Sequence, residues 1–337
     1  NSTQSSPLFQ GLKSIFCSLG ADRLLFFTQV YLIPVAFLLV LVIGLSLNCL
    51  VLWLTFHHTR HWNRSTLFLC NLTLADTTWI LTLPFLIHYH FVGLQWIFGS
   101  LVCRAVRCLY HACFYSSIYF VTCISLDRYL AIVHPARSLL LLNKRHSLYI
   151  CSAIWVLAIA VSIPTALMTF AIPCSSNHTV CTLYIFSYDP GRALPYSVIS
   201  TVTGCVLPFT AICFCYWNCT KKLKRHHLQC EQKKKKLFRL MYSVLIIFGL
   251  MYLPYHLVRN ACIMVRVLRA HQTWLIHNSD AGFLIEMAFC SLNTCLNPFF
   301  YFVTNGSAKN SLRKTLSTCC GATKQVVRLK VAAIHPV

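Results

Sequence analysis

The sequence predicts an all-α membrane protein, a bundle of seven membrane-spanning helices. Of its 337 residues, 57% are hydrophobic and only 11% are charged, whereas soluble domains carry about 25% charged residues. Seven apolar runs reach the length of roughly 20 residues that a spanning helix needs. These runs are continuous, while the strands of a membrane β-barrel would show alternating segments of about ten residues. Helices are therefore expected throughout.

The seven runs divide the chain into three regions. Residues 1–27 form an N-terminal segment, residues 28–304 the spanning domain and residues 305–337 a C-terminal tail. The predicted spans are 26–56, 66–92, 101–133, 148–170, 195–218, 237–265 and 274–303.

Basic residues predict the orientation of these spans. The segments after runs 1, 3 and 5 and the C-terminal tail hold most of the lysines and arginines, including Lys233 to Lys236. Cytoplasmic loops carry such an excess, so we expect a plasma-membrane protein with an extracellular N-terminus. Two N-x-S/T triplets then fall outside the cell, at Asn1 and Asn177, and both are candidate glycosylation sites.

Charge and motifs narrow the function. The net charge of +22 does not indicate nucleic-acid binding, because basic clusters beside apolar spans face anionic lipid. The chain has only seven acidic residues and neither a Gly-rich phosphate loop nor an H-E-x-x-H motif, so we expect no enzyme. It also shows no internal repeat, which many transporters have. A transporter or channel is therefore the less favoured alternative to a receptor.

Each run carries a polar residue or a proline that would be costly on a lipid-facing helix. In this order and spacing the residues resemble the signature of rhodopsin-class G-protein-coupled receptors, over about residues 28–320. The resemblance implies a heterotrimeric G protein as partner. In chain order the signature residues are Asn48, Asp76, Asp127-Arg128-Tyr129, Trp155 with Pro164, Pro208 with Tyr216, Phe248 with Pro254, and Asn297-Pro298 with Tyr301.

Asp76 lies inside a span and needs partners. Asn48, Ser117, Asn293 and Asn297 can supply oxygens and amides from facing helices. This set matches the sodium pocket of the receptor class, and hard cations prefer oxygen ligands. The alternative is a hydrogen-bonded polar core without an ion. We expect no other cofactor.

The resemblance also implies a set of switch residues. Ile118, Pro208 and Phe248 match a core triad that repacks on activation, and the two prolines of runs 5 and 6 bend their helices. Arg128 would engage the G protein, with an ion pair to Asp127 as the simpler reading. The full set is Asp127, Arg128, Tyr129, Ile118, Pro208, Tyr216, Phe248, Tyr252 and Tyr301.

Two departures from the class affect this switch. Tyr252 stands where the class usually has Trp. The acid that often locks Arg128 at the start of run 6 is replaced by the lysines 233 to 236. We therefore expect raised basal activity.

The resemblance implies one disulfide among the 20 cysteines, between Cys103 at the start of run 3 and Cys181 in the loop after run 4. Cys174 lies nearby as a competitor. Cysteines inside the apolar runs are expected to be small buried hydrophobes.

The tail carries a second feature of the class. Cys319 and Cys320 follow a basic amphipathic stretch, residues 309–316. They resemble palmitoylation sites that anchor a short amphipathic eighth helix to membrane lipid, with unmodified thiols as the alternative.

The ligand is indicated by the outer halves of runs 3 and 6. Run 7 has no lysine for retinal, and run 3 has no acid before Asp127 for an amine. Arg107 and His111 share one face of run 3, while His256 and Arg259 share a face of run 6. Arginines inside spans are expensive unless they serve a purpose, and arginine binds carboxylate or phosphate bidentately.

This pattern resembles the nucleotide, succinate and oxoglutarate receptor group, and segments 84–89 and 96–99 look closest to the oxoglutarate and succinate receptors. A small extracellular anion, a nucleotide or a carboxylate metabolite, is therefore the expected ligand. The arginine of that group in outer run 7 is replaced here by Met287, preceded by Glu286. Two alternatives stay open: a lipid acid as ligand, or Glu286 paired with an arginine and no anion bound. The predicted ligand-binding residues are Tyr89, Arg107, His111, Tyr115, His256 and Arg259.

Overall fold

The computed structural model describes residues 23–58, 62–136, 138, 143–175, 178–183, 185, 190–225, 231–269 and 271–304. Several predicted features lie outside these residues: the glycosylation sites Asn1 and Asn177, the palmitoylation sites Cys319 and Cys320, the eighth helix and the side chain of Tyr301.

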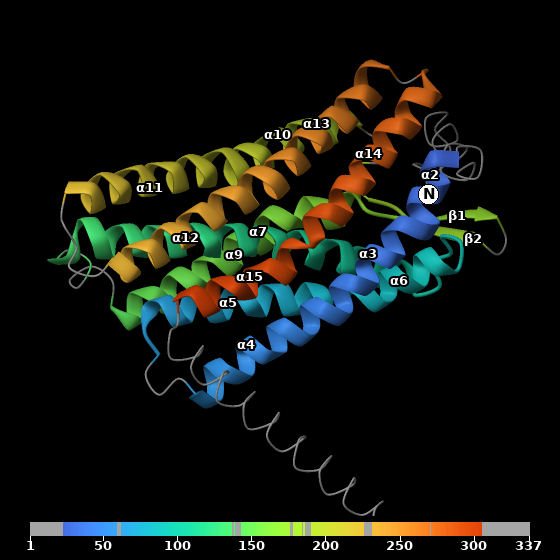
Figure 1. Cartoon of the computed structure of the whole chain (residues 1–337). Coiled ribbons are helices and arrows are strands. Elements are labelled where there is room, and N and C mark those ends of the chain that lie inside the picture. Colours follow the sequence, from blue (N-terminus) through green and yellow to red (C-terminus); the bar gives the residue numbers. More distant parts are fainter. Residues whose placement is uncertain are drawn as a thin grey trace, which may run out of the picture.

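Seven helices long and apolar enough to cross a membrane pack into one bundle, which confirms the predicted fold class (Figure 1). Each coincides with a predicted run, and the fifth extends further at both ends. The spans are Arg23–His57, Arg64–Phe91, Gly99–Val133, Lys144–Met168, Pro190–Lys224, Leu237–Leu268 and Thr273–Phe300.

Most spans consist of more than one helical element. Span 1 contains α2 (Arg23–Phe27), η2 (Thr28–Leu32), α3 (Ile33–Leu39), η3 (Val40–Gly44) and α4 (Leu45–His58). Spans 2 to 4 are α5 (Arg64–Ile80) with α6 (Leu83–Phe91), then α7 (Gly99–Val133), then α9 (Lys144–Met168). Span 5 contains α10 (Pro190–Thr201), η5 (Val202–Val206) and α11 (Leu207–Arg225). Spans 6 and 7 contain α12 (Glu231–Ile247), η6 (Phe248–Tyr252), α13 (Leu253–Leu268), α14 (Thr273–Ser291) and α15 (Asn293–Thr304).

Asparagine side chains cap two of these helices. The side chain of Asn63 accepts a hydrogen bond from the backbone N–H of Thr66 at the start of α5, and Asn143 accepts one from His146 at the start of α9. Each satisfies one of the backbone donors that the first turn of a helix leaves unpaired. Spans 2 and 4 therefore begin at defined residues.

Prolines in spans 5 and 6 follow π-helical turns. The turn η5 precedes Pro208 and the turn η6 precedes Pro254. A proline has no N–H to donate, and π-helical turns occur inside α-helices mostly as isolated widenings. The sequence predicted bends here from the prolines, and the structure shows a widened turn ahead of each.

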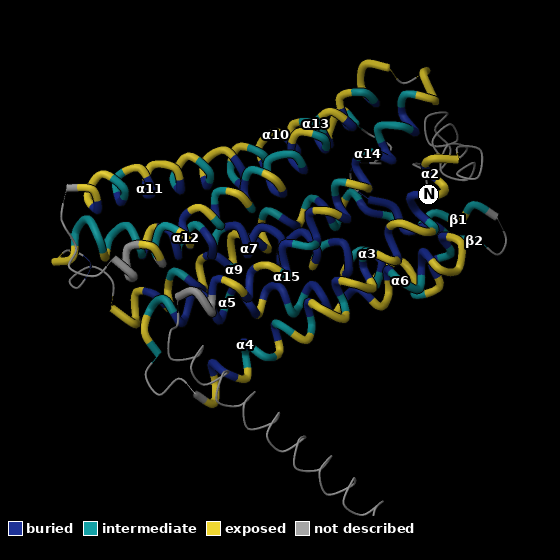
Figure 2. Tube along the Cα trace, viewed as in Figure 1, coloured by how far each residue is buried: buried dark blue, intermediate teal, exposed yellow. Residues whose placement is uncertain are grey.

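The helix α7 lies in the middle of the bundle, and most of its residues between Val106 and Asp127 are buried (Figure 2). Residues on the outer surfaces of the peripheral helices are apolar and exposed, for example Leu39, Val156 and Trp217. Such a surface suits a lipid solvent, in which apolar side chains need no cover.

A short antiparallel hairpin, β1 (Ala171–Ser175) and β2 (His178–Cys181), lies at one end of the bundle (Figure 1). We call this the hairpin end, and the end where α11 and α12 meet the opposite end. The predicted disulfide from Cys103 to Cys181 attaches β2 to the start of α7 and is confirmed. Cys174 is itself disulfide-bonded, so it does not compete for Cys181. The sequence did not predict these strands.

Candidate functional site

A pocket with about 580 Å³ of empty space, open solvent included, lies at the hairpin end. Its walls come from α2, η2, α6, α7, α14 and the chain around β2. Two of the six predicted ligand-binding residues, Tyr89 of α6 and Arg107 of α7, line it. The other four do not appear in this lining. The six predicted ligand-binding residues are thus not all in one cavity.

Arg107 is the cation of this pocket. Its side chain is only 4% exposed. One guanidinium nitrogen donates a long hydrogen bond of 3.4 Å to the backbone oxygen of Cys181. The Nε atom is buried and has no hydrogen-bond partner within the described residues. A buried charge normally requires a partner, so this guanidinium is suited to receive an anion.

Asp280 of α14 lines the same pocket and forms an ion pair with Arg266 of α13. Both side chains are buried, and the thiol of Cys262 donates to the second Asp280 oxygen at 3.2 Å. This pair was not expected from the sequence. Asp280 is one of the few acids of the chain and lies inside a span, where an acid needs a partner. That position could have predicted a pairing with a nearby arginine.

Arg259 lies away from the pocket and is fully buried, with 0% exposure. It donates to Tyr115 Oη at 2.9 Å, to the Ser197 backbone oxygen at 3.0 Å, and to the hydroxyls of Ser200 and Thr201, both at 2.9 Å. All four acceptors are neutral oxygens. Arg259 therefore connects α13 to α7 and α10, and both of its terminal nitrogens are already engaged.

His111 and His256 lie close to Arg259 and Tyr115. The Nδ1 atom of His256 lies 3.0 Å from the Arg259 guanidinium, and Nδ1 of His111 lies 3.3 Å from Tyr196 Oη. The rings of His111 and Tyr115 lie 4.7 Å apart. We use the name inner cluster for His111, Tyr115, Tyr196, His256 and Arg259.

Glu286 pairs with neither arginine. Its buried Oε1 atom has no hydrogen-bond partner within the described residues, and the terminal nitrogens of Arg259 donate to the neutral oxygens described above. The alternative in which Glu286 neutralises Arg107 or Arg259 is therefore wrong for this structure.

A polar core lies further along α7 from the hairpin end. Asn297 donates to Asp76 Oδ2 at 2.9 Å and to Ser117 Oγ at 3.1 Å. Tyr252 receives a hydrogen bond of 2.5 Å from Asn293, and its hydroxyl lies 3.5 Å from Ser117. Tyr252, which stands where the class usually has Trp, thus connects span 6 to spans 3 and 7 through its phenol.

This core fits an oxygen-coordinated cation. A pocket of about 300 Å³ is lined by Asp76, Ser117 and Asn293 among others. The side-chain oxygens of Asn297 and Asn48 are buried without a hydrogen-bond partner among the described residues. A carboxylate, a hydroxyl and amide oxygens are the ligand types that a hard cation prefers.

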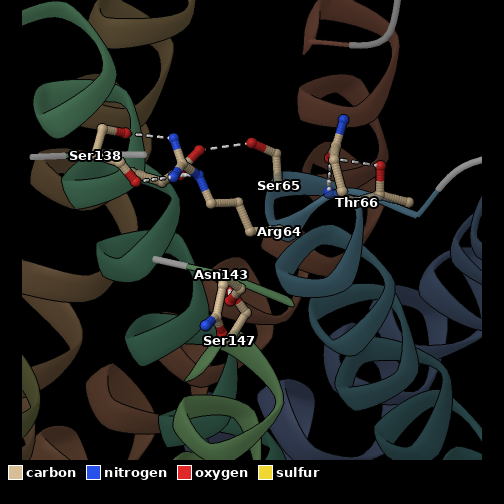
Figure 3. A network of polar contacts seen from close by, with 8 residues as sticks. Arg64, Ser65, Thr66, Ser138, Asn143 and Ser147 are labelled. Atoms are coloured by element: carbon tan, nitrogen blue, oxygen red, sulfur yellow. Dashed lines mark hydrogen bonds and ion pairs between the residues drawn. The ribbon is translucent and has the colours of Figure 1, made fainter. Parts of the chain in front are cut away.

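The opposite end carries a network around Arg64, shown in Figure 3. Arg64 of α5 approaches Asp127 at 2.6 Å, and Ser65 donates to its other oxygen at 2.5 Å. Arg64 also donates to the backbone oxygen of Ser138 at 2.5 Å. Asp127 is thus paired with Arg64 and not with its neighbour Arg128. Within the described part of the chain Arg128 makes no ion pair.

The remaining switch residues lie as follows. Ile118 and Phe248 are fully buried, and Pro208 is buried at the start of α11. The Tyr216 hydroxyl lies 2.7 Å from that of Ser125, and the Tyr129 hydroxyl lies 3.3 Å from His134 Nε2.

Known proteins resemble this chain over most of its length. A family model described as 7 transmembrane receptor (rhodopsin family) matches residues 47–301. Purinoceptor 1 of Gallus gallus is 32% identical over 290 residues, covering 85% of this chain and 80% of the relative. Purinoceptor 4 of Xenopus laevis is 30% identical over 293 residues, covering 85% and 54%. Purinoceptor 1 of Homo sapiens is 30% identical over 289 residues, covering 85% and 77%.

Proposed function

Because the chain belongs to the rhodopsin family of seven-transmembrane receptors, we propose that it binds a small extracellular anion and signals through a heterotrimeric G protein. Membership of this family makes it a multi-pass plasma-membrane receptor and not an enzyme, and it removes the transporter or channel alternative. The relatives are purinoceptors by name, which supports a nucleotide among the candidate anions, beside the carboxylate metabolites indicated by the sequence.

One observation carries the proposal: the buried guanidinium of Arg107, whose Nε atom has no hydrogen-bond partner in the described part of the pocket. Removing a charge from water is costly unless a counter-charge compensates it. An anion bound bidentately would supply that counter-charge. In the proposed orientation the hairpin end faces the outside of the cell, so the pocket is reached from there.

The path from the pocket to the G protein follows α7. Arg107, His111 and Tyr115 lie on successive turns of this helix, and Tyr115 is joined to Arg259 of α13. Two prolines with widened turns supply spans 5 and 6 with a place to bend. A ligand that binds the bent, active arrangement better shifts the equilibrium toward it.

The experiment compares two arginines of α7 in cells that express equal amounts of receptor at the surface. Arg107→Gln removes the pocket cation. Arg104→Gln removes the same charge three residues earlier, where the guanidinium lies over the Phe170 ring at 5.3 Å and is not part of the pocket lining.

We expect Arg107→Gln to lower the potency of an anionic agonist by a factor of roughly 10 to 100, the cost of a lost charge-assisted hydrogen bond, while Arg104→Gln changes it little. Equal potency in the two variants would contradict the proposal.

A further inference from the structure

We infer that the ligand carries a single anionic group on an elongated apolar body, and that Asp280 rejects a second anionic group. This inference rests on the proposed function, because it assumes that the pocket at the hairpin end receives the ligand. It goes further by naming the class of ligand and the residue that selects it.

The charges around the pocket leave room for one anion. Two lining residues carry a formal charge, Arg107 and Asp280. The carboxylate of Asp280 is matched by Arg266, which is not part of the lining, so Arg107 is the cation without an acidic partner in the described wall. One carboxylate on the ligand neutralises it.

A second anionic group in this pocket would face Asp280, which lines the same wall. Like charges repel strongly where little water screens them, and Asp280 is only 5% exposed. The remaining polar side chains of the wall, such as His90 and His277, offer hydrogen bonds to a neutral ligand group. A nucleoside polyphosphate, with several negative charges, would require more cations than this wall presents.

The other walls favour a hydrocarbon chain. Leu25, Val180, Leu183, Leu284 and Met287 line the pocket from span 1, the hairpin and span 7. Each ligand methylene buried against such side chains raises affinity roughly fourfold. A monocarboxylate with a long hydrocarbon chain therefore satisfies both the cation and the apolar walls.

The test uses three probes of one length: dodecanoate, dodecanedioate and methyl dodecanoate, which carry one, two and no carboxylates. Adenosine diphosphate serves as the polyanionic probe. G-protein activation is measured on wild type, Arg107→Gln and Asp280→Asn at matched surface expression. The double variant Asp280→Asn/Arg266→Gln removes the acid without leaving Arg266 unpaired.

We expect dodecanoate to be at least roughly tenfold more potent than dodecanedioate on wild type, the effect of one uncompensated charge. Methyl dodecanoate should be inactive, and Arg107→Gln should lower the potency of dodecanoate by a factor of roughly 10 to 100. The gap between mono- and dicarboxylate should narrow in Asp280→Asn and also in the double variant.

Three results overturn the inference in different ways. If adenosine diphosphate or dodecanedioate is the stronger agonist on wild type and depends on Arg107, the ligand class is wrong and the proposed function stands. If the gap persists in both Asp280 variants, Asp280 does not select the ligand. If no probe gives a response that depends on Arg107, the inference and the proposed function both fall.

Discussion

The absence of a side chain at Gly204 lets the Tyr115 ring lie directly against the π-turn η5. A Cβ atom at position 204 would overlap Cε1 and Cδ1 of that ring. Tyr115 is fully buried and accepts a hydrogen bond from Arg259. One small residue in span 5 therefore sets the position of an aromatic ring in span 3 and of a guanidinium in span 6.

Gly204→Ala should destabilise the receptor for this reason. The methyl group would displace Tyr115, and overpacking of this kind costs about 1–3 kcal/mol. The measurement is the melting temperature of the purified receptor in detergent, which should fall by several degrees.

Gly249→Ala is the matched control, since Gly249 lies in the other proline-associated π-turn, η6, and a Cβ there meets no atom within 4 Å. This variant should keep or slightly raise the melting temperature, because alanine is favoured over glycine in helices. Equal losses in both variants would show that the π-turns, and not the contact with Tyr115, require glycine.

At the scale of elements, the start of α5 is joined to the end of α7 by Arg64 (Figure 3). Arg64 and Ser65 occupy both oxygens of Asp127, and Arg64 also reaches Ser138. Arg128 is left without an acidic partner in the described structure. The lysines at the start of span 6 were one reason to expect raised basal activity. The pairing of Asp127 with Arg64 of α5 is a second reason.

Arg64→Gln should therefore lower basal signalling. With Arg64 removed, Asp127 becomes available to Arg128, its neighbour on α7, and holds it in the resting arrangement. Ligand-independent G-protein activation, normalised to surface expression, should fall several-fold. Arg145→Gln, at an exposed position at the start of α9, removes a nearby basic residue and should have little effect. Basal signalling that rises in Arg64→Gln would show that Arg64 stabilises the resting state instead.

At the scale of the whole molecule, α7 connects three polar layers. The pocket with Arg107 lies at the hairpin end, the polar core around Asp76 lies in the middle, and the network around Asp127 lies at the opposite end. The inner cluster stands between the first two layers. Because these layers share one helix, a change at the pocket can reach the G-protein side through the packing of α7.

We propose sodium as an allosteric ion of the middle layer, and replacing it should change the response of the whole receptor. Sodium at the Asp76 core would favour the resting arrangement, so exchange of sodium for choline at constant ionic strength should raise agonist potency in wild type. Asp76→Asn removes the anionic ligand of the ion and should abolish this difference. Potassium provides the control for a general salt effect, and an equal response of Asp76→Asn to the exchange would argue against the site.

The sequence predicted some features of this protein correctly and did not predict others. The seven spans, the disulfide from Cys103 to Cys181 and the receptor family all agree with the structure and the relatives. The sequence did not predict the hairpin or the ion pair between Arg266 and Asp280. It also did not predict that Arg259 lies outside the pocket. Arg107 and Arg259 were expected to line one cavity, yet neutral oxygens of α10 engage Arg259.

Hydropathy and loop charge are local properties, so the sequence by itself determined the number of spans, the expected orientation and the order of the signature residues. The partner of a buried charge is not local. Asp127 has Arg128 beside it in the chain but pairs with Arg64, which lies on another helix. Only the packing of the helices decided which oxygen faced which guanidinium, because hydrogen bonds and ion pairs act over a few ångströms and depend on which helix faces lie against each other.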